Sequence, residues 1–202
     1  MSTYKLTINL ETQDVKDINV AQQRITMVKK VGGSSGSKVA WVSFNPFEHN
    51  EVTWDAKYGI YASSTTVQNG SEIYKTSAVN PAICELSYPF ENGTFSAPVS
   101  GDTPNAYGIK NQYSQQFTFG LAQSVTANGC KFDASPLNAV PVLSMQTSTF
   151  TPIEKIEVFL HSNFNNGVVI SDITSKALEL DFTNDQNITI RYDKTVGQFV
   201  IA

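Results

Sequence analysis

Apolar and polar residues alternate along much of this chain, as they do in β-strands that bury one face and expose the other. The clearest case is YKLTINL, in which every second residue is apolar, and it predicts a first strand over 4–10. Residues 15–31 fit both a helical stripe and a strand. We favour a strand over 24–31, because the glycine-rich GGSSGS (32–37) follows and joins it to the next apolar run as a hairpin.

Short apolar runs continue to the end of the chain and are separated by turn signals. These signals include Asn-Gly pairs at 69–70, 92–93 and 128–129, and an Asn-rich turn at 161–167. Pro141 lies within one apolar run and predicts an edge strand or a bulge there. The predicted strands after the glycine-rich loop are 38–44, 51–62, 58–67, 83–90, 94–96, 117–125, 139–145, 153–160, 168–173, 177–182, 188–192 and 198–201.

Many short strands with turns between them predict an all-β protein, a single antiparallel β-sandwich joined by hairpins. The chain of 202 residues fits one such domain, and no change in composition marks a second. We therefore expect one domain over 1–202, with at most one short helix.

Composition and charge narrow the classes of partner. Only 16% of the residues are charged and the net charge is −4, so no basic stripe favours nucleic acid. No apolar run could span a bilayer, and the start MSTYKLTINL has no signal-peptide pattern, so we expect a cytoplasmic protein. The two cysteines, Cys84 and Cys130, lack metal-type spacing. We expect buried, free thiols in a reducing compartment, with a disulfide as the alternative.

Candidate binding residues gather in 38–64, KVAWVSFNPFEHNEVTWDAKYGIYASS, which holds both tryptophans and one of the two histidines. Aromatic rings offer stacking faces to a flat ligand, and neighbouring amide and imidazole groups can orient it. The alternative is that these rings form the core of the sandwich. The candidate ligand-binding residues are Trp41, Asn45, Phe47, His49, Trp54, Tyr58 and Tyr61.

The same stretch contains a candidate site for a divalent metal. In an extended strand His49, Glu51 and Asp55 share one face, while Val52 and Trp54 share the other. An imidazole and two carboxylates are suitable ligands for a divalent cation. A solvated polar strand face predicts the same alternation, so both interpretations stay open.

Enzyme motifs are weak in this sequence. GGSSG at 32–36 matches G-x-S-x-G, but that motif needs a helix after the serine, and a strand is predicted there. No phosphate loop, zinc spacing or triad pattern appears. We expect a protein that is not an enzyme.

Four segments carry a resemblance to a known family: TWDAKYGIYAS (53–63), QFTFGLAQS (116–124), PLNAVPVL (136–143) and TFTPIEKIEVFL (149–160). They resemble the mushroom pink chromoprotein family, small all-β proteins of fungi and some bacteria. The resemblance implies a β-sandwich, a homodimer and a non-covalently bound aromatic pigment with a metal ion nearby; it identifies no individual site residue. The alternative function is that of a lectin-like or membrane-active defence protein of the fungal fruiting-body type.

Overall fold

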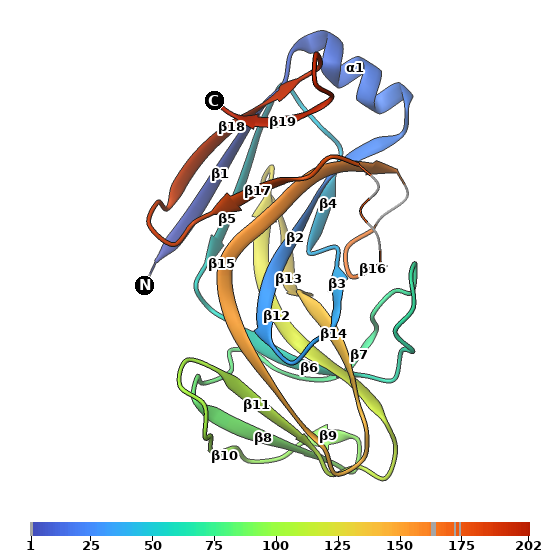
Figure 1. The fold of residues 1–202 in the computed structure, drawn as a ribbon, viewed down its shortest axis with the longest axis vertical. Coiled ribbons are helices and arrows are strands. Elements are labelled where there is room, and N and C mark those ends of the chain that lie inside the picture. The colour runs from blue at the N-terminus through green and yellow to red at the C-terminus, as the bar shows by residue number, and fades with distance from the viewer. Residues whose placement is uncertain (1, 163–164, 172, 174) are drawn as a thin grey trace.

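The computed structural model describes residues 2–162, 165–171, 173 and 175–202. Within these residues, two curled sheets of 11 and 8 strands enclose one main hydrophobic core, as expected for an all-β sandwich (Figure 1). The predicted fold class is confirmed. The same residues contain one helix, α1 (Thr12–Val20), and it lies at the end of the molecule opposite β8, β10 and β11.

The larger sheet has the strand order β16-β3-β14-β12-β5-β1-β18-β19; β13 and β6 also pair with β12, and β7 pairs with β6. Its strands are β1 (Thr3–Asn9), β3 (Ser37–Val39), β5 (His49–Asp55), β6 (Gly59–Ser63), β7 (Lys75–Val79), β12 (Phe117–Ala127), β13 (Cys130–Pro136), β14 (Asn138–Val142), β16 (Val169–Ile170), β18 (Asn187–Asp193) and β19 (Gln198–Ile201).

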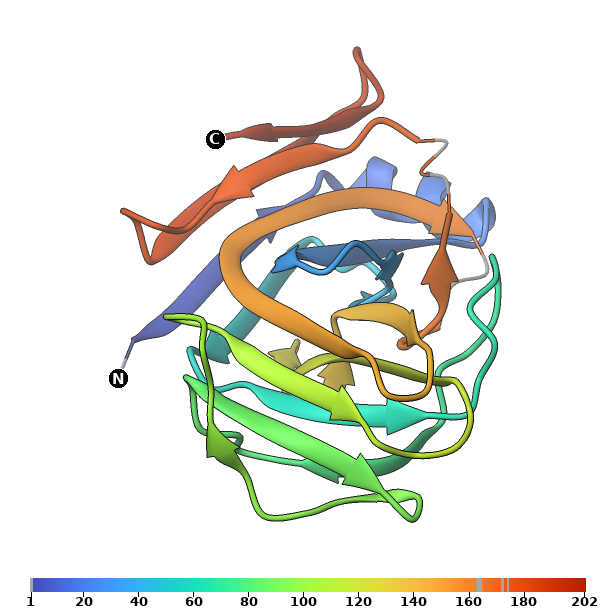
Figure 2. The same ribbon diagram turned by 60° about the horizontal axis from the view of Figure 1, so that its bottom comes forward.

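The smaller sheet has the order β10-β8-β11-β15-β2-β4, with β17 beside β15 and β9 beside β8. Its longest strand, β15, curls around β2 (Figure 2). Its strands are β2 (Gln23–Gly33), β4 (Val42–Phe44), β8 (Leu86–Glu91), β9 (Thr94–Phe95), β10 (Val99–Ser100), β11 (Tyr107–Asn111), β15 (Thr147–Ser162) and β17 (Leu178–Asp181).

The sheets are mixed, so the prediction of a purely antiparallel sandwich is wrong in this respect. β1 pairs with β18 in parallel, and β8 pairs with β11 in parallel. Alternation of apolar and polar residues fixes which face a strand buries, but it is the same for parallel and antiparallel neighbours. The direction of pairing therefore could not be read from the pattern.

The ambiguous segment 15–31 contains the end of a helix and most of a strand. The predicted strand over 24–31 is confirmed within β2, and α1 precedes it. Only Asp14 and Ile18 of α1 are buried, and Asp14 lies in the first turn, where an acidic residue suits the helix dipole. With so few buried positions, the apolar stripe of this helix is too narrow to distinguish it from a strand.

The glycine-rich loop joins strands in different sheets. β3 pairs with β14 and β16, whereas the strand beside β2 is β4. The chain thus leaves the smaller sheet, crosses to the larger one and returns at Val42, so the predicted strand 38–44 is interrupted at residues 40–41. The predicted strand 51–62 is likewise interrupted between Asp55 and Gly59.

The Asn-Gly pairs at 92–93 and 128–129 form the hairpin turns predicted for them. All four residues have positive φ, between 49° and 81°, as a two-residue hairpin turn requires. The second turn leads into β13, a strand that the pattern did not predict. The predicted Asn-rich turn at 161–167 lies partly outside the described residues.

Pro141 lies in β14 opposite Thr118 of β12, two residues beyond the last residue paired with β3. Because β3 no longer pairs with β14 at this position, the missing N–H of Pro141 costs no hydrogen bond to β3. This is what the prediction of an edge position requires. The cysteines are free as expected, but both are exposed, so the predicted burial of the thiols is wrong.

Candidate functional site

The central stretch 38–64 divides among β3, β4, β5 and β6, and its side chains go to different places. The alternation predicted for β5 is confirmed: His49, Glu51 and Asp55 are exposed, while Val52 and Trp54 are buried. The candidate ligand-binding residues accordingly separate into a buried group around Lys29, a second buried position at Tyr61, and surface residues at one groove and one strand face.

The buried group surrounds a lysine that the sequence reasoning did not select. The side chain of Lys29 has 0% exposure, and its Nζ lies 5.1–6.0 Å from the centroids of four aromatic rings. The four rings belong to Tyr4, Trp41, Trp54 and Tyr58. We call Lys29, these four residues, Gln123 and Glu154 the Lys29 centre.

Two oxygens accept hydrogen bonds from the amine of this centre. Lys29 Nζ donates to Glu154 Oε2 at 2.7 Å and to Gln123 Oε1 at 2.9 Å. Burial lowers the pKa of Lys29 to about 8, although the carboxylate of Glu154 partly opposes this shift. The four rings contribute cation–π attraction but supply no counter-charge.

The hydrogen bonds of Glu154 and Gln123 fix their side chains around the amine. Tyr58 donates its hydroxyl proton to Glu154 Oε1, and Trp54 Nε1 lies 3.4 Å from Glu154 Oε2. Burial and the nearby carboxylate raise the pKa of Tyr58, so its hydroxyl stays a donor. Gln123 Nε2 donates to the carbonyl of Asp55 at 2.7 Å, which turns its oxygen toward the amine.

Tyr61 belongs to a separate buried cluster between β6 and its neighbours. Its hydroxyl donates to the carbonyl oxygen of Asn138 at 2.5 Å. Because Tyr61 has 0% exposure, it contributes to packing and offers no surface to a ligand. Its predicted role in ligand binding finds no support in its position.

The three candidate metal ligands have separate partners along the exposed face of β5. His49 Nδ1 lies 2.9 Å from Asn9 Oδ1, and Glu51 pairs with Lys5 at 2.5 Å. Asp55 Oδ1 accepts a hydrogen bond from Thr3 at 2.6 Å. In the part of the chain that the structure describes, no group of three or more His, Cys, Asp or Glu side chains could hold a metal ion. The geometry therefore does not support the predicted metal site.

Asn45 and Phe47, the other two candidates, line a surface groove of about 650 Å³. We call it the Phe47 groove. It combines aromatic rings, which the half-buried Phe44 and Phe132 supply beside Phe47, with amides and one guanidinium. The residues used below are Arg24, Phe44, Asn45, Phe47, Glu72 and Phe132.

Phe47 is 58% exposed, yet its backbone is held on both sides. The side chain of Asn50 accepts from the N–H of Phe47 at 2.9 Å and donates to its C=O at 2.7 Å. Asn50 is itself fully buried and is fixed by Asn128 and by the carbonyl of Ile8. The apolar ring is thus presented to solvent on a fixed loop.

Arg24 supplies the positive charge of the Phe47 groove. Its Nε donates to Asn45 Oδ1 and its Nη1 to Asn165 Oδ1, both at 3.2 Å. Both partners are neutral amides, and among the described residues no salt bridge neutralises this guanidinium. Its charge remains available to an anionic group.

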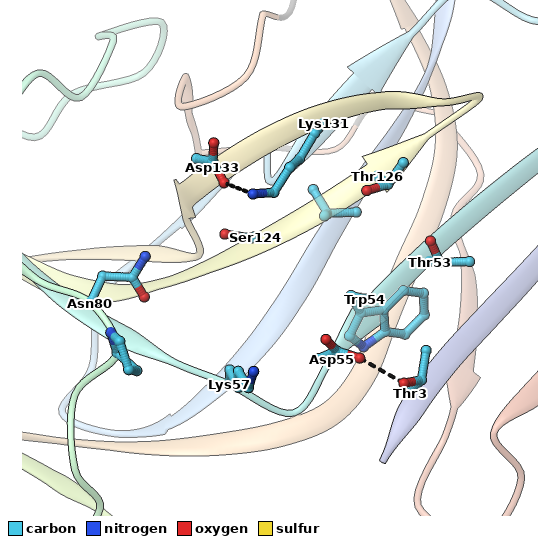
Figure 3. Close-up of a pocket in the computed structure, with 12 residues that line it drawn as sticks. Thr3, Thr53, Trp54, Asp55, Lys57, Asn80, Ser124, Thr126, Lys131 and Asp133 are labelled. Carbon is cyan, nitrogen blue, oxygen red and sulfur yellow. Dashed lines mark hydrogen bonds and ion pairs between the residues drawn. The ribbon is translucent and has the colours of Figure 1, made fainter. Parts of the chain in front are cut away.

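A second groove, of about 510 Å³, opens between β1, β5 and the β12–β13 hairpin (Figure 3). Hydroxyls, carboxylates and amines dominate its lining, and we call it the polar groove. Lys131 and Asp133 form an ion pair of 2.6 Å on one side, and Asp55 lies on the other. Trp54 forms part of the wall, but it is only 3% exposed, because most of its ring faces the Lys29 centre.

No family model, curated protein or solved structure matches this chain. The resemblance to the mushroom pink chromoprotein family therefore stays a hypothesis. The described part of the chain contains no helix long and apolar enough to cross a membrane.

Lys29, Gln123 and Glu154 are the residues that the sequence analysis missed. Each is a polar residue inside an apolar run: ITMVKKV for Lys29, FTFGLAQSV for Gln123 and TPIEKIEVFL for Glu154. A buried charge needs a partner, so a lysine and a glutamate in predicted buried strands were a usable signal. Arg24, just before ITMVKKV, carried no comparable signal.

Proposed function

We propose that this protein is a non-enzymatic binding protein for a small, flat aromatic molecule with an acidic group, held in the Phe47 groove. The observation that carries the proposal is the exposed ring of Phe47 on a loop that the buried Asn50 fixes. An exposed apolar ring costs free energy in solvent, and a rigid ring loses little entropy when a ligand stacks on it.

The charge of the groove supports an acidic ligand. Among the described residues, the guanidinium of Arg24 donates to two neutral amide oxygens and to no carboxylate, so a ligand carboxylate can form a charge-assisted pair with it. Glu72 also lines the groove and can accept a hydrogen bond from a hydroxyl of the same ligand. A phenolic acid or a pigment of that class has both groups.

Fluorescence titration with anilinonaphthalene sulfonate, a flat aromatic anion, tests the proposal. We expect saturable binding that Phe47→Ser and Arg24→Met each weaken roughly tenfold. For Arg24→Met the reason is the loss of a hydrogen bond to a charged group, which contributes about 1.5–3 kcal/mol. The uncharged phenylnaphthylamine is the matched probe, and its binding should respond to Phe47→Ser but not to Arg24→Met.

Val20→Ser is the control variant, because Val20 is an exposed apolar residue on α1 that does not line the groove. Near-UV circular dichroism verifies that each variant keeps its tertiary packing, since compact, partly folded states that retain their secondary structure also bind such dyes. Equal affinity of wild type, Arg24→Met and Phe47→Ser for the anionic probe would exclude the Phe47 groove as the site.

Carbohydrate binding in the polar groove is the second candidate function. The observation in its favour is the lining of carboxylates, hydroxyls and the amide of Asn80, which suits the recognition of sugar hydroxyls. The small exposed area of Trp54 weighs against it, because little of the ring is open for a sugar to stack on. Retention on a sugar matrix that Asp55→Ala abolishes would favour this candidate over the first.

We also propose that the protein works in the cytoplasm as a homodimer. The exposed free thiols of Cys84 and Cys130 support a reducing compartment, while the dimer follows only from the family resemblance. Differential alkylation of a fresh cell lysate tests the first point, and sedimentation equilibrium tests the second.

A further inference from the structure

The Lys29 centre brings together an amine, a carboxamide and a carboxylate in a largely buried site, where the side chain of Lys29 has 0% exposure and that of Glu154 17%. Lys29 lies on β2 in the smaller sheet, Gln123 on β12 in the larger sheet, and Glu154 on β15 beside β2. Glu154 lies within the irregularity that interrupts the pairing of β15 with β2 between Pro152 and Ile156, and bulges of this kind redirect side chains. These three groups are the reactants and the proton carrier for forming an amide.

We propose that Lys29 and Gln123 condense into an intramolecular isopeptide bond across the two sheets, with Glu154 as the catalytic acid–base. Lys29 Nζ attacks Gln123 Cδ, the bond from Nζ to Cδ forms, and the bond from Cδ to Nε2 breaks. One ammonia leaves. The amine and the carboxamide become a secondary amide, no atom is oxidised or reduced, and no further reactant is consumed.

The amine must lose a proton before it can attack, and the site favours this loss. Burial lowers the pKa of Lys29 to about 8, so the neutral amine is accessible near physiological pH. The hydrogen bond of 2.7 Å from Nζ to Glu154 Oε2 provides a direct path for the proton. Glu154 can then return a proton to the departing nitrogen.

The carboxamide is held close to the amine, and hydrogen bonds at both of its ends fix its position. Nζ lies 2.9 Å from Gln123 Oε1, and a C=O bond of about 1.23 Å then places Cδ within about 4.1 Å of Nζ. The hydrogen bond from Nε2 to the carbonyl of Asp55 prevents the amide from flipping. Asp55 also lines the polar groove, and we assign this groove as the route by which the ammonia leaves.

The surroundings protect the product. The side chain of Lys29 has 0% exposure and Gln123 is 1% exposed, so water that would hydrolyse the new amide is excluded. The bonded residues lie 94 positions apart in the chain, so the bond would join distant strands of opposite sheets. It would form whether or not the Phe47 groove holds a ligand.

Intact-mass spectrometry of the purified full chain tests the proposal. We expect wild type to be lighter than its own sequence mass by one ammonia, and a protease digest to contain a branched peptide that joins Lys29 to Gln123. A folded wild type at its full sequence mass after prolonged incubation at pH 8–9 would overturn the proposal. Loss of one water with a peptide joining Lys29 to Glu154 would overturn the assignment of Gln123.

Three variants identify the roles of the residues. Lys29→Met and Gln123→Met should each keep the full sequence mass. Lys30→Met is the matched control and should still lose ammonia, because Lys30 is on the same strand but pairs with Glu179 at the surface. Glu154→Gln should slow the loss of ammonia by roughly a hundredfold or more. An unchanged rate in folded Glu154→Gln would overturn the catalytic role of Glu154.

Discussion

Trp41 and Trp54 meet edge to face, with their ring centroids 5.3 Å apart and their planes inclined at 83°. The amine of Lys29 lies 5.4 Å from the centroid of Trp41 and 5.6 Å from that of Trp54. The sequence predicted these two rings as a stacking surface for a ligand. In the folded protein Trp54 stacks on Tyr4, Trp41 meets Trp54 edge to face, and both rings lie beside the lysine amine, so both belong to the core.

This arrangement predicts that one substitution in β5 strongly lowers the free energy of unfolding, while a second one nearby leaves it almost unchanged. Trp54→Ala should lower the free energy of unfolding by about 3–5 kcal/mol, because it removes a buried ring that also packs against Tyr4 and Phe182. Glu51→Ala should change it by no more than about 0.5 kcal/mol, since the pair with Lys5 is exposed and screened. Urea denaturation of both variants checks this. Similar losses would contradict the division of β5 into a core face and a solvated face.

Local patterns were enough to predict the class of fold. The alternation in YKLTINL gave β1, and the Asn-Gly pairs gave two hairpin turns, because both signals depend on neighbouring residues. The same alternation correctly separated the two faces of β5. Pairing direction and the crossing at residues 40–41 depend on residues distant in the sequence, and no local signal encodes them.

The candidate site was predictable only in part, for the same reason. Asn45 and Phe47 do line a groove, but the residue that gives it charge, Arg24, arrives from β2. In the Lys29 centre, the contacts of the amine span 94 and 125 positions in the sequence. A sequence pattern shows that such a lysine is buried, but only the fold shows which carboxylate faces it.

Asn50 couples stability to the Phe47 groove. Asn50→Ala would leave the N–H and C=O of Phe47 without their partner. We expect a loss of about 1–3 kcal/mol in unfolding free energy, together with severalfold weaker binding of anilinonaphthalene sulfonate because the loop is no longer fixed. Asn9→Ala is the control, since Asn9 is exposed and, among the described residues, its side chain forms one hydrogen bond, to the exposed His49. Unchanged probe affinity in Asn50→Ala would show that fixing this loop does not matter for binding.

Gly120 permits the close packing of Tyr61. A Cβ at Gly120 would lie 2.1 Å from the carbonyl oxygen of Asn138 and 2.8 Å from the ring of Tyr61. Because the first contact is with backbone, Gly120→Ala should destabilise the protein by about 1–3 kcal/mol. Gly32→Ala is the matched control, as its Cβ would come closest to the flexible end of Ile153, at 3.2 Å, and would lie at ordinary contact distances of 3.6 and 3.7 Å from Thr151. Thermal melting of the two variants decides whether this contact is as tight as the distances indicate.

Asp181 should make stability depend on acidity. The hydroxyl and amide of Thr183, followed by Lys155, hold the pKa of Asp181 at about 2, whereas an unfolded aspartate titrates near about 3.9. The folded state thus favours the carboxylate, and the stability that this provides is complete above about pH 4 and is lost as the pH falls toward about 2. Asp181→Asn removes the titrating group, so its melting temperature should fall less steeply than that of wild type between about pH 4 and pH 2. Lys155→Met should keep most of the wild-type slope, because the hydrogen bonds from Thr183 are the larger cause of the shift. Melting curves of wild type and Asp181→Asn that run parallel through this window would show that the folded protein does not stabilise the Asp181 carboxylate.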